Sequence, residues 1–297
     1  MSYHTQHRTF RLGFLNRVYA PQFEPRLYQQ TLELFEAAEE LGFDSGWLAQ
    51  HHFASENGRL PSPLVLLSAA AERTRHIQLG TGIVVLNQEN ALRLAEDASV
   101  LDLLSQGRLQ LGLGAGFDPD SFAAFGQSLE GRHAQYDLRL ERLRQALAGE
   151  PLNDDGRVLR PAANGLDRRL WEATSRVEQV AERGNGLILA PNPTVGAESR
   201  PQVIERYRKA WNPVHSGTPR VAWCAPYSPA PMPRRRARPC AGTSSPTSNA
   251  SDASALAMQT RHRGSRQYST LSACSMATRR RSPDNCSRTH RWAPMTN

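Results

Sequence analysis

The fold of this chain is decided by residues 76–117, which read HIQLGTGIVVLNQENALRLAEDASVLDLLSQGRLQLGLGAGF. Two apolar runs, Ile77–Leu86 and Arg108–Gly114, flank a stretch whose apolar residues recur at helical spacing. Asn90 can cap this helix and Gly107 can end it, because an Asn side chain accepts backbone N–H groups and glycine adopts left-handed conformations readily. The stretch therefore predicts a βαβ unit with two parallel strands.

The same alternation of short apolar runs and amphipathic stretches continues on both sides of this unit. The expected strands are Arg11–Leu15, Ser45–Ala49, Ile77–Leu86, Arg108–Gly114, Arg169–Thr174, Gly186–Ala190 and Arg220–Trp223. The expected helices are Pro25–Leu41, Ser62–Arg73, Asn90–Ser105, Gly131–Ala148, a helix from Ser175, and Ser199–Trp211. In a chain of 297 residues this pattern predicts an α/β fold, a (β/α)8 TIM barrel of about 250 residues, with an excursion at 118–168 that opens on an acidic turn.

The alternation stops after the start of the seventh strand. Residues 224–297 contain 12 Arg, 8 Pro and 19 Ser or Thr, but no Val, Ile or Phe. Such a segment cannot bury enough apolar area to offset ordering costs of about 1–2 kcal/mol per residue. We therefore expect an incomplete barrel domain at 1–223 and an Arg/Ser/Pro-rich tail at 224–297. A shift of the coding frame near residue 224 is the favoured explanation, and a disordered basic tail is the alternative.

The net charge of +8 comes from this tail, which carries +10, whereas residues 1–223 carry −2. The basic pI therefore gives no reason to expect nucleic-acid binding by the barrel. All four cysteines also lie in the tail, at spacings that match no paired zinc pattern, so no metal site is expected. No run reaches the roughly 18 apolar residues of a membrane span and no secretory signal is visible, so we expect a cytoplasmic protein without membrane contacts.

Two histidines, His51 and His52, lie just after the second expected strand, in the segment Trp47–Phe53. In α/β barrels the carboxyl end of the strands carries the active site. Histidine is also the natural acid or base near neutral pH. These residues are therefore candidates for proton transfer, and a pair of surface histidines in a loop is the alternative.

Small residues mark two further strand ends. Gly80 and Gly82 interrupt the third expected strand, where glycine lets a flat ligand approach the backbone, and a bulge or a packing compromise is the alternative. Ala115 and Gly116 follow the run Leu109–Gly114, whose glycine spacing is not that of a dinucleotide fingerprint. The glycines of the third strand are therefore candidates for contact with a flat ligand.

Thr174, Ser175 and Arg176 lie where the fifth expected strand ends and a helix begins. The free N–H groups of a helix start, together with hydroxyl groups, favour an anion such as a phosphate. Ser175 and Glu178 also fit a capping box, so helix capping without a ligand is the alternative.

Together these motifs resemble the bacterial luciferase-like flavin-dependent monooxygenases, in particular an FMN-dependent subgroup. The resemblance covers about residues 10–223. It also rests on Asn90–Asp97, Leu101–Leu109 and Phe122–Gly126, which stand in the family's order and spacing. It implies an enzyme that binds reduced FMN, reacts it with O₂ and inserts one oxygen atom into a small organic substrate. A separate flavin reductase would supply the reduced cofactor, and since members of this family often dimerise, a homodimer is a further expectation.

The resemblance also assigns roles to residues. It implies a catalytic histidine at His51 with His52 beside it, and a flavin-ring contact at Gly82–Ile83, often through a non-prolyl cis peptide. Thr174 and Ser175 match the phosphate-binding turn.

One position departs from the family. Luciferases carry an arginine on the flavin phosphate where this chain has Ala115, beside Gly116, so Arg176 is expected to compensate. Two alternatives to an FMN monooxygenase stay open: a deazaflavin-dependent oxidoreductase on the same barrel, and an inactive truncated product of a disrupted gene. The substrate does not follow from the fold.

Overall fold

The structure is a computed structural model that describes residues 10–20, 24–53, 57–189, 198–215 and 217–223. All of these residues belong to the first of two units into which the chain divides, Met1–Arg236. Residues 224–297, for which we expect a disordered or frame-shifted tail, lie outside the described residues. The division of the chain at residue 223 therefore stays a prediction.

The strands form one parallel sheet, as the alternating sequence pattern predicted. They are β1 (Gly13–Asn16), β2 (Ser45–Leu48), β3 (Gln78–Thr81), β4 (Val84–Val85), β5 (Leu109–Gly114), β6 (Leu170–Glu172), β7 (Gly186–Leu189) and β8 (Val221–Trp223). Their order is β1-β2-β3-β5-β6-β7-β8, and β4 pairs with β5. The described part of the chain is thus a half-barrel of the α/β type whose edges are β1 and β8.

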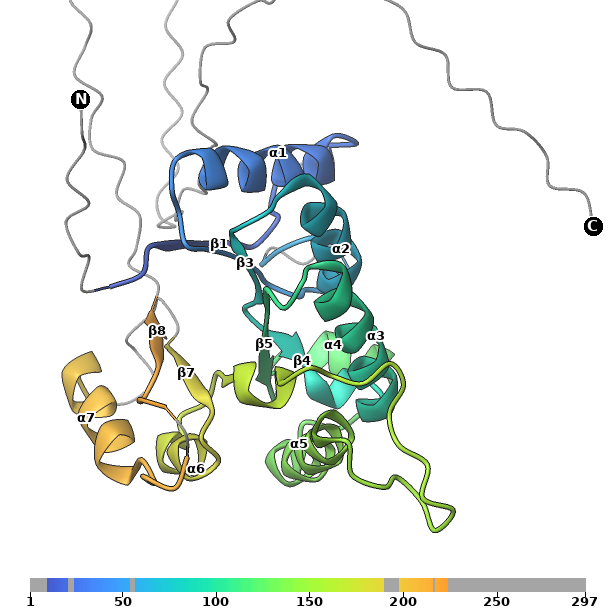
Figure 1. Cartoon of the computed structure of the whole chain (residues 1–297), viewed down its shortest axis with the longest axis vertical. Helices are drawn as coiled ribbons and strands as arrows, with labels where there is room; N and C mark the ends of the chain where they lie inside the picture. Colours follow the sequence, from blue (N-terminus) through green and yellow to red (C-terminus); the bar gives the residue numbers. More distant parts are fainter. Residues whose placement is uncertain (1–9, 21–23, 54–56, 190–197, 216, 224–297) are drawn as a thin grey trace, which may run out of the picture. The chain divides into compact units, whose positions relative to one another are not determined.

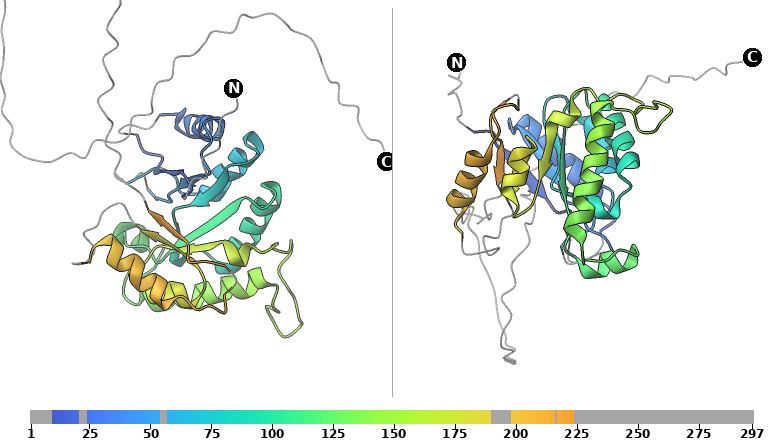
Figure 2. Two further views of the ribbon diagram at one scale, coloured as in Figure 1. Left: turned by 60° about the vertical axis from the view of Figure 1, so that its left-hand side comes forward. Right: turned by 90° about the horizontal axis from the view of Figure 1, so that it is seen from below.

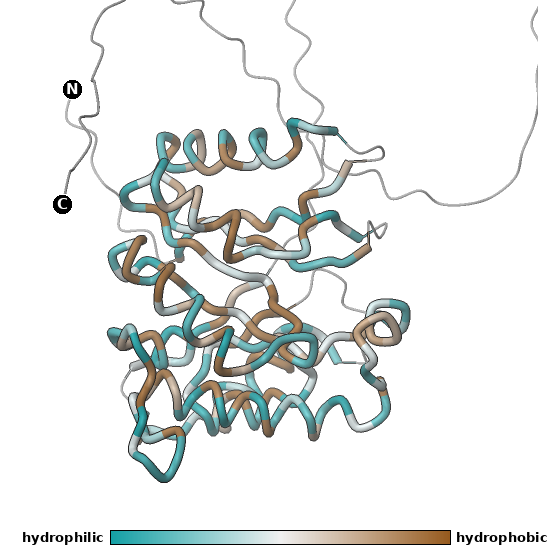
Figure 3. Tube along the Cα trace, turned by 90° about the vertical axis from the view of Figure 1, so that its right-hand side faces the viewer, coloured by the Kyte–Doolittle hydropathy of each residue, from teal (hydrophilic) through white to brown (hydrophobic). Residues whose placement is uncertain are grey.

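Helices connect the strands and cover one side of the sheet (Figures 1 and 2). They are α1 (Leu27–Glu40), α2 (Pro63–Arg73), α3 (Ala91–Leu104), α4 (Pro119–Ala124), α5 (Arg132–Ala148), α6 (Val177–Glu182) and α7 (Arg200–Ala210), with short 3-10 turns η1 (Leu86–Gln88) and η2 (Leu166–Arg169). Successive helices contact one another, α1 with α2, α2 with α3, α3 with α5, and α6 with α7. Along α1, at the top of Figure 3, apolar and polar residues alternate as an amphipathic helix requires.

The two faces of the sheet differ in side-chain size, and β5 shows this most clearly. Leu109, Leu111 and Leu113 are fully buried in the core shared with the helices. Because strand side chains alternate, the residues between them point to the inner side of the half-barrel, and two of these are Gly112 and Gly114. Each fully buried leucine stabilises the fold by roughly 1.5–3 kcal/mol.

Two tryptophans fill the inner side of the half-barrel. Trp47 on β2 and Trp171 on β6 meet edge to face, with ring centroids 5.4 Å apart. Glycines beside them leave room for the rings, since a Cβ atom at Gly80 would lie 2.3 Å from Trp47 and one at Gly186 would lie 2.3 Å from Trp171. Because β3 and β5 separate the two strands, the rings can touch only if the sheet curls as in a barrel.

A buried ion pair ties α3 to the start of β6. The Arg169 guanidinium donates two hydrogen bonds to the Asp102 carboxylate, at 2.6 and 2.8 Å. It also donates to the carbonyls of Gly107 and Leu109, which flank the start of β5. The Asp102 side chain is only 3% exposed, so these hydrogen bonds, rather than water, must stabilise the two buried charges.

The helix starts agree with the sequence only in part. Asn90 caps α3, as predicted, by accepting from the N–H groups of Leu92 and Arg93. The capping box at Ser175 is wrong, because α6 starts at Val177 and Arg176 is its N-cap without a side-chain cap. Glu178 pairs instead with Arg206 of α7.

Three other elements differ from the sequence expectations. The expected strand Ile77–Leu86 is two strands, β3 and β4, separated by Gly82 and Ile83. The expected acidic turn is the short helix α4, capped by the Asp118 side chain. Ser62 precedes α2, but its side chain makes no capping bond. Within the described residues, no helix is both long and apolar enough to cross a membrane.

We predict that Asp102→Ala lowers the free energy of unfolding by about 3–5 kcal/mol, because it leaves the Arg169 charge buried without its carboxylate. Asp97→Ala on the same helix is the matched control. It removes only an exposed pair with Arg93 and should cost about 0.3–0.5 kcal/mol. Urea denaturation of both variants measures their free energies of unfolding. Equal losses would show that the Asp102–Arg169 pair contributes no more to stability than an exposed pair.

Candidate active site at the carboxyl ends of the strands

All the sequence-predicted site residues follow the carboxyl ends of parallel strands. His51 and His52 follow β2, Gly82–Ile83 follow β3, Ala115 and Gly116 follow β5, and Thr174–Arg176 follow β6. Parallel strands end at the same edge of the sheet, so the fold brings these segments to one edge. Three of these segments lie close together at Gly114. A Cβ atom built there would lie 2.9 Å from the Ile83 side chain and 3.5 Å from the Ala173 carbonyl.

His51 lies half-buried in the loop after β2. The backbone N–H of His51 donates to the carbonyl of Leu60 at 2.9 Å. A Cβ atom at Gly58 would lie 2.5 Å from its ring, so the loop packs closely over the imidazole. Burial and the nearby Arg17 lower the pKa of His51 to about 4, and Asp118 opposes this shift. The ring is therefore neutral at pH 7 and is able to accept a proton.

His52 packs into an aromatic cluster rather than beside the strands' open edge. Its ring lies 4.8 Å from that of Phe125 and 5.8 Å from that of Phe53. Burial lowers the pKa of His52, and Asp118 again opposes the shift. Its Nε2 atom is buried and has no hydrogen-bond partner among the described residues. The two neighbouring histidines thus have different surroundings.

Glycines form a cradle at the ends of β3 and β5. The peptide bond between Gly82 and Ile83 is cis, of the non-prolyl type that the family resemblance implied. A Cβ atom at Gly82 would lie 2.9 Å from Leu15, and one at Gly116 would lie 2.5 Å from Val85. Gly116 also has a φ of +80°, a conformation that other residues rarely adopt. Leu15 beside Gly82, and Val85 and Phe122 beside Gly116, already occupy the space that larger residues would need at these two positions.

The turn after β6 is backed by a buried polar network that the sequence did not predict. Glu172, the last residue of β6, is fully buried and accepts hydrogen bonds from Tyr136, Arg183 and Asn185. Burial and the nearby Glu172 carboxylate raise the pKa of Tyr136 well above its usual value. The only sequence signal for this network is a carboxylate in an otherwise apolar strand.

This network also engages Arg176. Its two terminal nitrogens donate to the two oxygens of Asp137 at 2.7 and 2.9 Å, and Arg183 donates to the same carboxylate at 2.8 Å. The backbone N–H of Arg176 donates to the Thr174 hydroxyl at 3.2 Å, while Ser175 is exposed. The guanidinium that was expected to compensate for Ala115 is thus already bound to a carboxylate.

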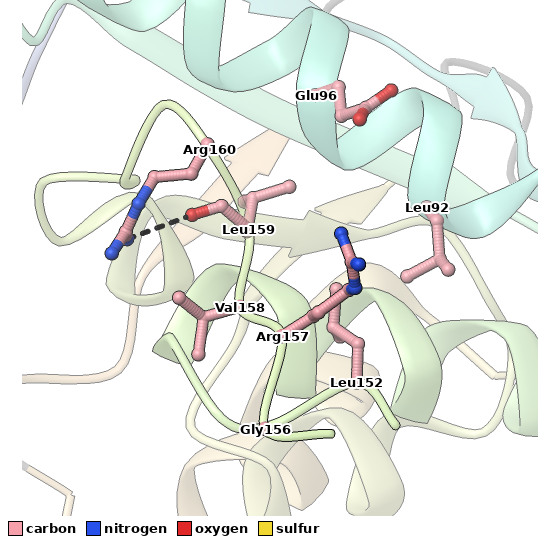
Figure 4. A pocket seen from close by; sticks show the side chains of 8 residues that line it. All are labelled: Leu92, Glu96, Leu152, Gly156, Arg157, Val158, Leu159 and Arg160. Atoms are coloured by element: carbon pink, nitrogen blue, oxygen red, sulfur yellow. Dashed lines mark hydrogen bonds between the residues drawn. The ribbon is translucent and has the colours of Figure 1, made fainter. Parts of the chain in front are cut away.

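Two cavities lie among the described residues, and the lining of the second includes Phe125, which packs against His52, and Glu89, which bonds Gln50. One, of about 510 Å³, lies between α3 and the turn at 152–160, and Figure 4 shows its lining side chains, which include Arg157, Arg160 and Glu96. The other, of about 550 Å³, is lined by residues 87–92 and by parts of α5. Neither contains a predicted site residue. Among the described residues, no cluster of three His, Cys, Asp or Glu residues could hold a metal.

A family model described as luciferase-like monooxygenase matches residues 14–236. The alkanal monooxygenase alpha chain of the Kryptophanaron alfredi symbiont is 30% identical over 193 residues, which cover 60% of this chain and 53% of that protein. The chain spans about half the length of the curated relatives it matches.

Solved structures share the fold. Monooxygenase RslO1 from Streptomyces bottropensis superposes with a TM-score of 0.62 and 30% identity, covering 68% of this chain and 65% of that one. The oxygenating constituent of 3,6-diketocamphane monooxygenase from Pseudomonas putida, in complex with FMN, gives 0.61 at 17% identity, covering 72% and 66%. An F420-dependent secondary alcohol dehydrogenase gives 0.58 at 20% identity, covering 72% and 68%. At these last two identities the likeness concerns the fold alone.

We predict that His51 titrates near pH 4 when followed by NMR, well below the ordinary 6.5, because burial disfavours its cationic form. The stability that depends on its neutral ring is then present above pH 6.5 and is lost as the pH falls toward 4. Asp118→Asn should lower the midpoint further, since it removes a carboxylate that raises this pKa, while Asn can still cap α4. A midpoint near 6.5 would contradict the buried position of the ring.

Proposed function

Since the chain belongs to the luciferase-like monooxygenase family, we propose that it uses reduced FMN and O₂ to oxygenate a small organic substrate. The observation that carries this proposal is the neutral, half-buried His51 at the same sheet edge as the glycine cradle of Gly82, Gly114 and Gly116. A separate flavin reductase is the proposed source of the reduced cofactor. A homodimer is proposed as the assembly, and neither nucleic acid nor membrane as a partner.

A flavin is proposed to bind at the strand ends. Its ring is proposed to lie along Gly82–Ile83, the segment to which the family resemblance assigns it. The phosphate is proposed to bind at Thr174 and Ser175. Reduced FMN, when bound, supplies the electrons that activate O₂.

The phosphate turn carries little net charge in this proposal. Two guanidinium groups, those of Arg176 and Arg183, are balanced by the carboxylates of Asp137 and Glu172. Ala115 adds no charge where luciferases carry an arginine. Hydroxyl and N–H donors at Thr174 and Ser175 are therefore proposed to hold the phosphate, with Gly116 and Ala115 forming the wall beside it.

His51 is proposed to move a proton during the oxygenation. With a pKa of about 4 the neutral ring is a weak base, and any proton that it accepts from the reacting group it returns readily as an acid. The close packing of Gly58 over the ring and the aromatic cluster around His52 keep water away from it. His52 is proposed to shape this side of the site rather than to exchange protons.

A deazaflavin-dependent hydride transfer is the second candidate. The F420-dependent alcohol dehydrogenase shares the fold, and the glycine cradle would accept either flat ring. Titrating the purified protein with each cofactor and recording the absorbance distinguishes the two candidates.

We predict that His51→Ala lowers substrate oxygenation by about 10²-fold or more, the usual contribution of a general acid or base. Flavin affinity should change little, because the histidine is not a proposed flavin anchor. The exposed His76, on the turn before β3, supplies the control variant His76→Ala, which should keep full activity. Single-turnover oxygenation by flavin reduced in advance measures the effect, and full turnover by His51→Ala would remove this residue from the mechanism.

We predict that Ser175→Asp weakens FMN binding at least tenfold more than riboflavin binding, because the new carboxylate repels the phosphate that only FMN carries, by roughly 1.4 kcal/mol or more. Quenching of flavin fluorescence measures both affinities. An equal loss for the two ligands would mean that the phosphate lies elsewhere or that the turn is damaged.

A further inference from the structure

Gln50, the residue before His51, joins three segments of the site. Its side chain is 5% exposed and uses both of its polar atoms. The side-chain oxygen accepts from the N–H of Val85 at 2.7 Å. The side-chain nitrogen donates to the Pro61 carbonyl at 3.0 Å and to the Glu89 carboxylate at 2.9 Å.

The backbone of Gln50 adds a fourth bond, since its N–H donates to the carbonyl of Ile83 at 3.2 Å. Gln50 therefore contacts both ends of the Ile83–Val85 segment, one with its backbone and the other with its side chain. The next residue along the chain is His51. One residue thus fixes the His51 loop against the strand segment that follows Gly82.

We propose that Gln50 is a positioning residue, which holds the His51 imidazole at a fixed place relative to the Ile83–Val85 segment against which the flavin is bound. This inference rests on the proposed function for the identity of the ligand. The positioning itself concerns contacts within the protein and is measurable without flavin.

Glu89, the carboxylate partner of Gln50, lies on a turn that other hydrogen bonds hold in place. Arg139 of α5 donates to the carbonyls of Glu89 and Leu86, on the turn that follows β4. Asn87 on the same turn donates to the carbonyls of Ala115 and Arg132, at 2.9 Å each. The turn is thereby fastened to α5 and to the end of β5, and Gln50 connects His51 to this framework.

The amide is required at position 50 because its surroundings need a donor and an acceptor together. The Val85 N–H needs an acceptor, whereas the Pro61 carbonyl and the Glu89 carboxylate need a donor. A glutamate would satisfy only Val85 and would oppose the second carboxylate. Burial raises the pKa of Glu89 and the Gln50 amide opposes this shift, as expected for a carboxylate that depends on this donor.

The test uses the full chain and three variants, Gln50→Met, Gln50→Glu and the double variant Gln50→Glu/Glu89→Gln. Gln50→Met keeps the size of the side chain and removes its hydrogen bonds. The control is Gln110→Met, since Gln110 is also 5% exposed and accepts one bond from Trp171 on the inner side of the sheet. The His51 midpoint by NMR, riboflavin and FMN affinity by fluorescence, and urea denaturation are measured for each protein.

We expect Gln50→Met to move the His51 midpoint up from about 4 toward 6.5 and to raise the riboflavin dissociation constant about tenfold, the scale of one lost buried hydrogen bond. Gln50→Glu should weaken riboflavin binding similarly. The double variant should recover only part of this loss, because it restores a donor–acceptor pair between the two positions but leaves the Pro61 carbonyl without its donor. Gln110→Met should lose stability while keeping the His51 midpoint and the flavin affinity.

Two results would overturn the proposal. One is an unchanged His51 midpoint in Gln50→Met. The other is a midpoint shift of equal size in Gln110→Met, which would mean that the effect of Gln50→Met comes from a general loss of stability. If the unchanged protein binds neither FMN nor riboflavin, the proposed function fails, and the His51 midpoint of the flavin-free variants still decides the positioning role.

Discussion

The edge-to-face contact between Trp47 and Trp171 depends on the curl of the sheet, and the arrangement of the site depends on the same curl. Their strands are separated by two others, so a flat sheet would hold the rings much too far apart to touch. Glycines at positions 80 and 186 make the contact possible by leaving space on the inner face. The carboxyl ends of β2, β3, β5 and β6 lie at the same edge of this curled sheet, and His51 and the glycines at positions 82, 114 and 116 lie at or just after them.

Stability and chemistry use opposite faces of the same strands. The outer residues are leucines that pack against helices, whereas the inner ones toward the carboxyl ends are small. This separation lets the inner face carry groups that pack poorly, such as Gly82 and Gly114.

Hydrogen bonds of buried polar side chains fix the loops that follow the strands, which small residues cannot do. Gln50 holds the loop after β2, and Glu172 holds the turn after β6 through Tyr136, Arg183 and Asn185. In each case a residue at or near a strand end bonds to chain segments far away in sequence. A buried polar group left without a partner costs more than the bond contributes, so these contacts are specific as well as stabilising.

Local sequence patterns were enough to predict the parallel α/β fold, the order of its elements, the cap at Asn90 and the strand ends at which the candidate residues lie, because periodicity and capping act over a few neighbouring residues. The pairing of side chains followed only from the packed structure. Glu178 bonds to Arg206 rather than to the start of its own helix, Arg176 is bound by Asp137, and the amide of Gln50 meets Glu89. These partners stand 28, 39 and 39 residues apart, and only the packed helices and the curled sheet bring them within hydrogen-bond distance.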